Sequence, residues 1–150
     1  MPDQNLLKVS NFFLEIGGLL VAGFSKATIG ERTVQVAKYR NGNDPPVMTN
    51  IAGLIEFGPL VLERGMTFDE PSSLELANWN KDVIDGKIEK SKKNISVIIK
   101  AQDLFTPAVR FNIIKALPTK YSISPLDSKT NEVVIEKIEI VHEGIDVVKG

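Results

Sequence analysis

The clearest pattern of apolar and polar positions lies in residues 133–141, where six of nine residues are Ile or Val. Branching at Cβ favours an extended strand over a helix. One face of this strand would carry Val134, Glu136, Ile138, Ile140 and His142, and the other Val133, Ile135, Lys137, Glu139 and Val141. Both faces mix apolar and charged residues, whereas a half-buried strand in a monomer has one face of each kind. Two interpretations fit: an edge or twisted strand, or a strand whose second face is covered by another subunit, which we favour.

Alternating apolar positions predict further strands along the chain. Residues 11–16 and 19–24 flank Gly17-Gly18, and glycine accepts the positive φ of a tight turn, so these segments predict a hairpin. The other predicted strands are 33–39, 54–64 with a break at Gly58-Pro59, 94–100 and 109–116. The LPTKY segment, 117–121, is expected to leave the last of these at a fixed bend.

A single helix is predicted after residue 72. Ser72 and Glu75 have the spacing of a capping box, in which each side chain accepts a hydrogen bond from the other residue's backbone N–H. Leu76, Trp79 and Val83 follow at helical spacing and form one apolar stripe. Gly86 is a suitable C-terminal stop. We expect about four turns, with Trp79 packed against an open face of the strands.

These elements define a fold class. About seven strands and one helix predict a mainly β protein, a small barrel or sandwich of two packed antiparallel sheets with one flanking α-helix. The chain has 150 residues, which suits one domain spanning 1–150.

Composition narrows the possible functions. The net charge is −1, so a general nucleic-acid partner is not indicated. There is no cysteine, which excludes disulfides, thiolate nucleophiles and sulfur-ligated zinc. The N-terminal residues lack a basic segment followed by an apolar core, so we expect no signal peptide, and no apolar run is long enough to span a membrane.

Two polar segments are candidate contact regions. Residues 40–50, RNGNDPPVMTN, combine Asn-Gly with paired prolines and predict a long loop or an extended hairpin arm. Such segments are often functional, so this one is either a solvated loop or a contact arm. Residues 87–93, KIEKSKK, form a short basic run, whose simplest interpretation is a solvated turn.

No catalytic or metal-binding arrangement is found. His142 is the single histidine, and His142-Glu143 lacks the second histidine of a zinc-protease helix. Asn41, Asn43 and Asp44 lack the spacing and terminal glutamate of a calcium loop. The phosphate-binding and nucleophile-elbow motifs are missing as well. The sequence therefore predicts a binding or assembly module, with no enzyme activity and no cofactor.

Several segments together resemble the tail tube proteins of contractile phages and bacterial contractile injection systems. They are NFFLEIGG (11–18) with VAGFS (21–25), VAKYRNG (36–42), LERGM (62–66), LANWN (76–80), KKNISV (92–97), ALPTKY (116–121), NEVVIE (131–136) and HEG (142–144). They span nearly the whole chain. One departure is Val109-Arg110-Phe111, where this family is expected to have a tryptophan.

The resemblance implies a small β-barrel that closes with five other copies into a ring. Strands of neighbours would join into one barrel around a channel, and stacked rings would form a tube that a contracting sheath drives through an envelope. Such a ring also removes exposed sheet edges. The mixed faces of 133–141 would then contact the chain's own core and a neighbour, with Glu136, Lys137 and Glu139 as candidate inter-subunit residues.

The resemblance also implies partners. The arm is the candidate inter-ring contact, through Asn41, Asn43, Asp44, Met48 and Asn50. The sheath is expected to contact Lys87, Lys90, Lys92 and Lys93 on the outer surface. Baseplate and tail-terminator proteins would bind the tube ends, and the lumen would hold DNA or an effector protein. Assembly would take place in the bacterial cytoplasm, without membrane insertion. Two alternatives stay open: a tube-initiating baseplate protein of the same fold, and a monomeric ligand-binding β-sandwich.

Overall fold

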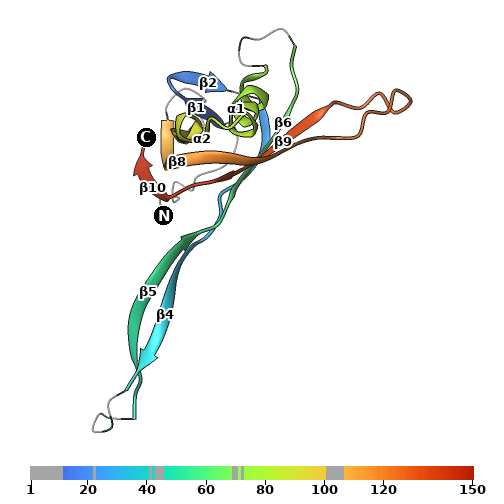
Figure 1. Ribbon diagram of the computed structural model, residues 1–150. Coiled ribbons are helices and arrows are strands. Elements are labelled where there is room, and N and C mark those ends of the chain that lie inside the picture. The colour runs from blue at the N-terminus through green and yellow to red at the C-terminus, as the bar shows by residue number, and fades with distance from the viewer. Residues whose placement is uncertain are drawn as a thin grey trace, which may run out of the picture.

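The computed structural model describes residues 12–21, 23–40, 42, 46–68, 71, 73–100 and 107–150. A body of strands with two helices carries a long two-stranded arm, and a second hairpin extends from another side (Figure 1). The elements are β1 (Phe12–Ile16), β2 (Leu19–Val21), β3 (Phe24–Thr28), β4 (Arg32–Tyr39), β5 (Thr49–Phe57), β6 (Leu60–Gly65), α1 (Glu75–Ile84), α2 (Ile88–Ser91), β7 (Lys93–Lys100), β8 (Pro107–Ile123), β9 (Ile135–Val141) and β10 (Gly144–Lys149).

The strands pair antiparallel throughout, which confirms the predicted fold class. In the body they follow the order β2-β1-β7-β8-β9-β6-β3, and β10 also pairs with β8. β4 and β5 form a separate two-stranded sheet, the arm. The two ends of the body order, β1 with β2 and β3, are not hydrogen-bonded to one another, so the described strands do not close into a barrel.

β8 takes part in both halves of the body. Its first half pairs with β7 on one side and β10 on the other, and its second half pairs with β9. The left-handed backbone of Lys115 (φ 51°) and a register shift after Pro118 bend the strand between these halves. The predicted bend at 117–121 is therefore present, but the prediction that the strand ends there is wrong, because pairing with β9 continues to Ile123.

The core lies between the two halves and follows the predicted alternation. Phe12, Leu14 and Ile16 of β1 are buried, and so are Leu60 and Leu62 of β6. They pack with residues from every layer of the body, which include Val21, Leu76, Trp79, Ile95, Val97, Ile113, Ala116, Ile138, Ile140 and Ile145. Burial of one face of each strand is the main stabilising term for such a sandwich.

The N-terminal hairpin is shorter than predicted. β1 and β2 flank Gly17 and Gly18, whose φ values of 55° and 85° confirm the expected turn. The return strand ends at Val21, however, and Gly23 (φ 84°) separates it from β3, which pairs with β6 instead. The prediction of one strand over 19–24 is wrong because a glycine with positive φ breaks it.

The helix is confirmed, with a different start. α1 begins at Glu75 and has ten residues, about three turns, with Leu74 at the N-cap and no side-chain cap hydrogen bond. The predicted capping box is therefore wrong for Glu75, and Ser72 lies outside the described residues. Gly86 (φ 87°) follows the C-cap as expected. The run 87–93, predicted as a solvated turn, contains the short helix α2, which sequence patterning missed.

Trp79 joins both helices to the sheet. Its side chain is 1% exposed, and its Nε1 donates to the Ser91 carbonyl at 2.6 Å. The next residue, Asn80, donates from Nδ2 to the Pro118 carbonyl at 3.2 Å, where β8 bends. The prediction that Trp79 packs against the strands is confirmed.

The strand at 133–141 is β9, and it is an inner strand. It pairs with β6 on one edge and β8 on the other, so the edge-strand interpretation is wrong. After His142 and Glu143 the chain continues as β10, which the sequence analysis did not predict. β10 pairs with the first half of β8 and is an outer strand.

We predict that Trp79→Ala lowers the free energy of unfolding by about 3–5 kcal/mol, because it removes a fully buried aromatic side chain and leaves the Ser91 carbonyl unpaired. A urea melt measures this loss. Ile84→Ala on the same helix, where Ile84 is 75% exposed, is the control and should cost less than about 1 kcal/mol. A loss below about 1 kcal/mol for Trp79→Ala would contradict the packing role.

Candidate assembly surfaces

The arm is a long surface that the described chain leaves uncovered. Every residue of β4 is exposed, and so is every residue of β5 before Phe57. Its exposed apolar side chains include Val34, Val36, Tyr39, Ile51, Leu54 and Ile55. A two-stranded hairpin alone is marginally stable in water, and contiguous exposed apolar surface marks interaction sites. The arm therefore has the character of an unoccupied interface.

The register places apolar residues on both faces of the arm. Val34 pairs with Ile55 and Val36 with Ala52, and paired residues point to the same side. Arg32 and Lys38 lie at the two ends of this first face. The second face carries Ala37 with Ile51 and Tyr39 with Thr49 near the tip, and Thr33 with Glu56 near the base. Gln35 Nε2 donates to Glu56 Oε1 at 2.9 Å on this side.

The base of the arm is a crossing of two glycines. Gly58 N donates to the Glu31 carbonyl at 2.7 Å. A Cβ added at Gly30 would lie 2.4 Å from the Gly58 carbonyl carbon, and one added at Gly58 would lie 2.9 Å from Glu31 N. Only glycine permits the two backbones to approach so closely, so β4 and β5 leave the body side by side at this point. Phe57 beside it contacts the His142 ring, with centroids 5.5 Å apart.

Of the predicted contact residues in 40–50, the structure describes Met48 and Asn50, which lie toward the distal end of this arm. The choice between a loop and an extended arm is settled, since 49–50 are already strand and pair with 38–39. Met48 is 46% exposed, and Asn50 is exposed opposite Lys38. Asn41, Asn43 and Asp44 lie outside the described residues.

The candidate outer lysines have different surroundings. Lys87 and Lys90 are exposed at the start and on the surface of α2. Lys92 Nζ lies 3.6 Å from Glu89 Oε1, and Lys93 Nζ lies 6.0 Å from the centre of the Trp79 ring. Lys92 and Lys93 therefore have partners in their own chain, while Lys87 and Lys90 offer their charge to solvent.

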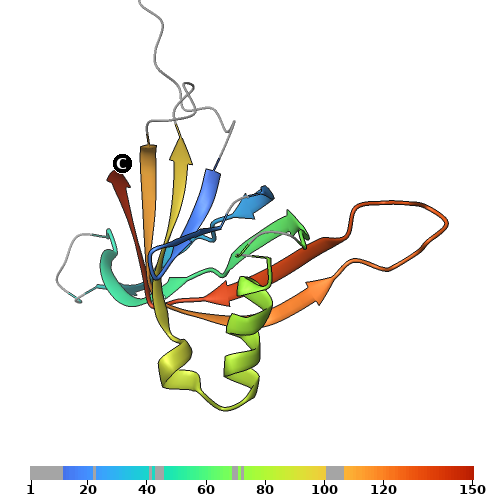
Figure 2. The ribbon, with the colours of Figure 1, turned by 90° about the horizontal axis from the view of Figure 1, so that it is seen from above.

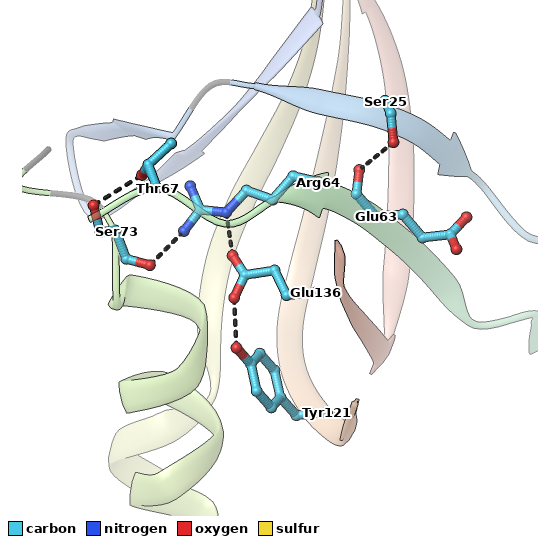
Figure 3. A network of polar contacts seen from close by, with 7 residues as sticks. All are labelled: Ser25, Glu63, Arg64, Thr67, Ser73, Tyr121 and Glu136. Atoms are coloured by element: carbon cyan, nitrogen blue, oxygen red, sulfur yellow. Dashed lines mark hydrogen bonds and ion pairs between the residues drawn. The ribbon is translucent and has the colours of Figure 1, made fainter. Parts of the chain in front are cut away.

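Glu136 does not have the position that an inter-subunit contact requires. Its residue is 1% exposed in the core of the body, and its carboxylate forms an ion pair with Arg64, which is also 1% exposed (Figure 3). Tyr121 Oη donates to the other carboxylate oxygen at 2.5 Å. Charge on this face of β9 is thus explained by a partner within the chain, and the subunit contact inferred for it is not needed.

The opposite face of β9 is accessible. Lys137 is exposed, Glu139 is half-buried and Val141 is 42% exposed. Ile135 on the same face is half-buried, and Val133 before the strand is 69% exposed. Lys137 and Glu139 therefore stay candidates for a contact with another copy, whereas Glu136 is buried in the body of its own chain.

The buried pair also holds the segment before α1. Arg64 Nη2 donates to the Ser73 carbonyl at 2.9 Å, and the Thr67 and Ser73 hydroxyls are 2.8 Å apart. Met66 N donates to the Val134 carbonyl at 2.8 Å. Arg64 thus links β6, β9 and the start of the helical region. Removing either charge would leave the other buried and unpaired, which typically costs several kcal/mol.

Tyr121 responds to this arrangement. Burial raises the pKa of its hydroxyl well above the ordinary value near 10, and the hydrogen bond to Glu136 and the negative charge of that carboxylate raise the pKa further, against an opposing contribution from Arg64. The tyrosine therefore stays protonated and donates to Glu136 under physiological conditions.

A second set of surfaces is formed by β1, β7, the first half of β8 and β10, which lie side by side (Figure 2). One face packs on the core. The register places Glu15, Ser96, Asn112 and Asp146 in one row across the other face. Ser96 Oγ donates to Asn112 Oδ1 at 2.8 Å, and Arg110 Nη1 lies 3.3 Å from Glu15 Oε2. The next row on this face aligns Phe13, Ile98, Arg110 and Val148. This face therefore carries both signs of charge together with apolar side chains.

An apolar pocket of about 250 Å³ opens between β1, β7 and β3. Its lining residues are Phe12, Ser25, Lys26, Ala27, Ile29, Val97 and Ile99. Phe12 and Phe24 stack across the gap with centroids 6.1 Å apart. We name this region the β1–β3 seam; it lies where the sheet fails to close and had no signal in the sequence, because its residues come from three separate segments.

Chemistry of other kinds is not supported by the described residues. They contain no group of His, Cys, Asp and Glu side chains that could hold a metal ion. Neither helix has the length and apolar character needed to cross a membrane, as far as the described residues go. Among the described residues His142 Nδ1 is buried without a hydrogen-bond partner, and its ring contacts Phe57.

Comparison with solved structures shows the fold. A chain of the extended sheath–tube complex of the PVC extracellular contractile injection system matches with a TM-score of 0.80 and 16% identity, over 97% of this chain and 93% of that one. A chain of the anti-feeding prophage tube-terminating cap gives 0.77 and 18%, over 100% and 95%. A chain of the anti-feeding prophage baseplate gives 0.68 and 20%, over 99% and 98%. No curated protein matches the sequence.

These likenesses define a fold used by proteins of contractile injection particles. The family model described as "T4-like virus tail tube protein gp19" matches residues 8–146, which is nearly the whole chain. The chain therefore belongs to this tail tube family, as the sequence resemblance indicated. Tail tube proteins are structural components of contractile tails.

We predict a pH effect from Tyr121. Because its folded-state pKa lies above the unfolded value, its contribution to stability is complete below about pH 10 and is lost as the pH rises further. The free energy of unfolding, measured by urea melts from pH 8 to 11.5, should fall more steeply for the native chain than for Tyr121→Phe. Equal slopes above pH 10 would contradict the hydrogen bond to Glu136.

Proposed function

We propose that this chain is the subunit of the inner tube of a contractile tail or injection particle. Six copies would form a ring, and rings would stack around a central channel. Membership of the tail tube family supports this role. The observation that carries it is the arm, because an exposed two-stranded ribbon with apolar side chains on both faces requires a partner on each face.

Stacked rings meet this requirement. One face of the arm can lie on a neighbour in its own ring and the other on a copy in the next ring. A head-to-tail contact of this kind is heterologous, and such contacts give rings when the rotation closes and filaments when it does not. A tube uses both outcomes, since it closes around the channel and extends along its axis.

The directions of the strands are compatible with a continuous barrel. β1, β7, β8 and β10 alternate in direction, so β10 of one copy would run antiparallel to β1 of the next. β10 is an outer strand, and β2 covers only Leu14–Ile16 on the outer side of β1. The mixed-charge face of Glu15, Ser96, Asn112 and Asp146 would then line the channel, where DNA or an effector protein would lie.

The sheath would contact the outer surface through Lys87 and Lys90, supported by Lys92 and Lys93. Baseplate and terminator proteins would bind the two tube ends. Assembly would take place in the bacterial cytoplasm before the particle forms. A tube-initiating baseplate protein of the same fold is the second candidate, favoured by the likeness to a chain of the baseplate structure. An initiator would form single rings, and a monomeric ligand-binding sandwich would form none.

We predict that deleting residues 42–46 from the arm tip leaves single rings and stops stacking, because the distal contact between rings is lost. Negative-stain microscopy of the purified protein distinguishes rings from tubes. Removing residues 127–130 from the β8–β9 hairpin, another projecting turn, is the control and should still give tubes. Long tubes from the 42–46 deletion would show that the tip is dispensable.

We also predict that Lys87→Glu with Lys90→Glu prevents sheath assembly on preformed tubes, since two exposed cations become anions opposite the acidic sheath residues that we propose they contact. Co-sedimentation of sheath protein with tubes measures binding. Lys115→Glu with Lys129→Glu makes the same change of net charge at exposed positions elsewhere and should leave binding intact. Unchanged binding by the Lys87/Lys90 variant would remove these lysines from the interface.

A further inference from the structure

The β1–β3 seam is incomplete within the described chain. Phe12 and Phe24 bridge it by stacking, yet an apolar pocket of about 250 Å³ remains open between β1, β7 and β3. β3 pairs with β6 on one side, and within the described residues its other edge pairs with no strand. An unpaired strand edge beside an apolar pocket is the arrangement that accepts a strand from a partner.

The first face of the arm has the matching properties. Val34, Val36, Ala52 and Ile55 lie together on it, and they share the apolar character of a pocket lined mainly by Phe, Ala, Ile and Val. Val36 is 55% exposed and Ile55 is 61% exposed. The outer edges of β4 and β5 are also unpaired among the described strands, because each pairs only with the other. The arm and the seam are therefore both apolar, and each has a strand edge that is unpaired among the described strands, so each can serve as the partner of the other.

An arm does not fill the seam of its own chain. Ile29 lines the pocket, and the arm leaves the body at the adjacent Gly30–Gly58 crossing and extends away from it (Figure 1). The eight residues of β4 reach about 27 Å at roughly 3.4 Å per residue. A compact body of this size is roughly 30–40 Å across. The arm is therefore long enough to cross much of an adjacent copy.

We propose that the Val34–Val36–Ile55 face of the arm seats on the β1–β3 seam of a neighbouring copy, where β4 or β5 lies along the free edge of β3 and apolar side chains fill the pocket. This inference deepens the proposed tube function and rests on it. It assigns a receptor for the arm, and it completes the open sheet of each copy with a strand from the next.

The absence of cysteine from the chain permits a direct test. Val36→Cys and Ser25→Cys, introduced together, place one thiol on the arm face and one on an exposed, near-isosteric seam position. Disulfides form only when Cα atoms approach within about 7 Å, so mild oxidation of assembled protein reports this contact. We expect a covalent ladder on a non-reducing gel, with products up to six times the mass of one chain.

Three matched variants set the outcome. Thr33→Cys with Ser25→Cys uses the second arm face, and Val36→Cys with Ser128→Cys uses a distant turn; both should stay at the mass of one chain. Leu6→Cys with Ser25→Cys asks whether the N-terminal segment occupies the seam instead. A ladder from either control pair in place of the Val36/Ser25 pair, or a compact disulfide-closed monomer from Leu6/Ser25, would overturn the assignment.

Microscopy of the same samples separates the two proposals. Tubes without a Val36/Ser25 ladder would overturn the seam contact and leave the tube function standing. A protein that stays monomeric at all concentrations in light scattering, with unchanged Trp79 fluorescence as evidence of folding, would overturn both.

Discussion

The structure depends on β8 serving two half-sheets at once. Its first half is held between β7 and β10 and its second half pairs with β9, so one strand of 17 residues sets how the two half-sheets lie relative to each other. The bend that makes this possible lies at Lys115 and Pro118. α1 is anchored at the same point through Asn80 and the Pro118 carbonyl. Pro118 has no N–H to donate to the neighbouring strand, and its carbonyl accepts from the helix, so α1 takes part in the hydrogen bonding at the bend.

A buried ion pair stabilises the second half. Arg64 and Glu136 face one another across β6 and β9, Tyr121 donates to Glu136, and Arg64 donates to the Ser73 carbonyl. Such pairs contribute little net stability compared with apolar residues of the same size, but removing one of the two charges is strongly destabilising, because the other charge then stays buried without a partner. The pair therefore acts mainly on specificity: it requires β6, β9 and the segment before α1 to meet in one arrangement.

Much of the fold could be predicted from local patterns. Alternation at Phe12, Leu14 and Ile16, the Gly17-Gly18 turn and the stripe of Leu76 and Trp79 each reflect a short-range rule, and each was confirmed. Failures came from long-range effects. The charge at Glu136 suggested a subunit contact, because its partner Arg64 is 72 residues away and no periodicity reports it. The continuation of β8 beyond Pro118 likewise depends on β9, which is distant in sequence.

The assembly surfaces were only partly foreseeable. The proline-rich 40–50 segment indicated an arm, but the apolar faces of that arm come from the register between β4 and β5, with a bulge near Val34 and Val36 that shifts the pairing. The basic run at 87–93 could be recognised from the sequence. Its partners within the chain could not, because Lys93 lies over the Trp79 ring and Lys92 lies near Glu89 only in the folded structure. The β1–β3 seam had no sequence signal, because three segments meet there only after folding.

The alternating directions of β1, β7, β8 and β10 have a geometric consequence for any closed circle of copies. Each copy contributes an even number of alternating strands, so the total is even and every junction is antiparallel whether five, six or seven copies close. Parity therefore imposes no choice of symmetry. The number of copies, and hence the bore of the channel, must be decided by the wedge angle between adjacent bodies.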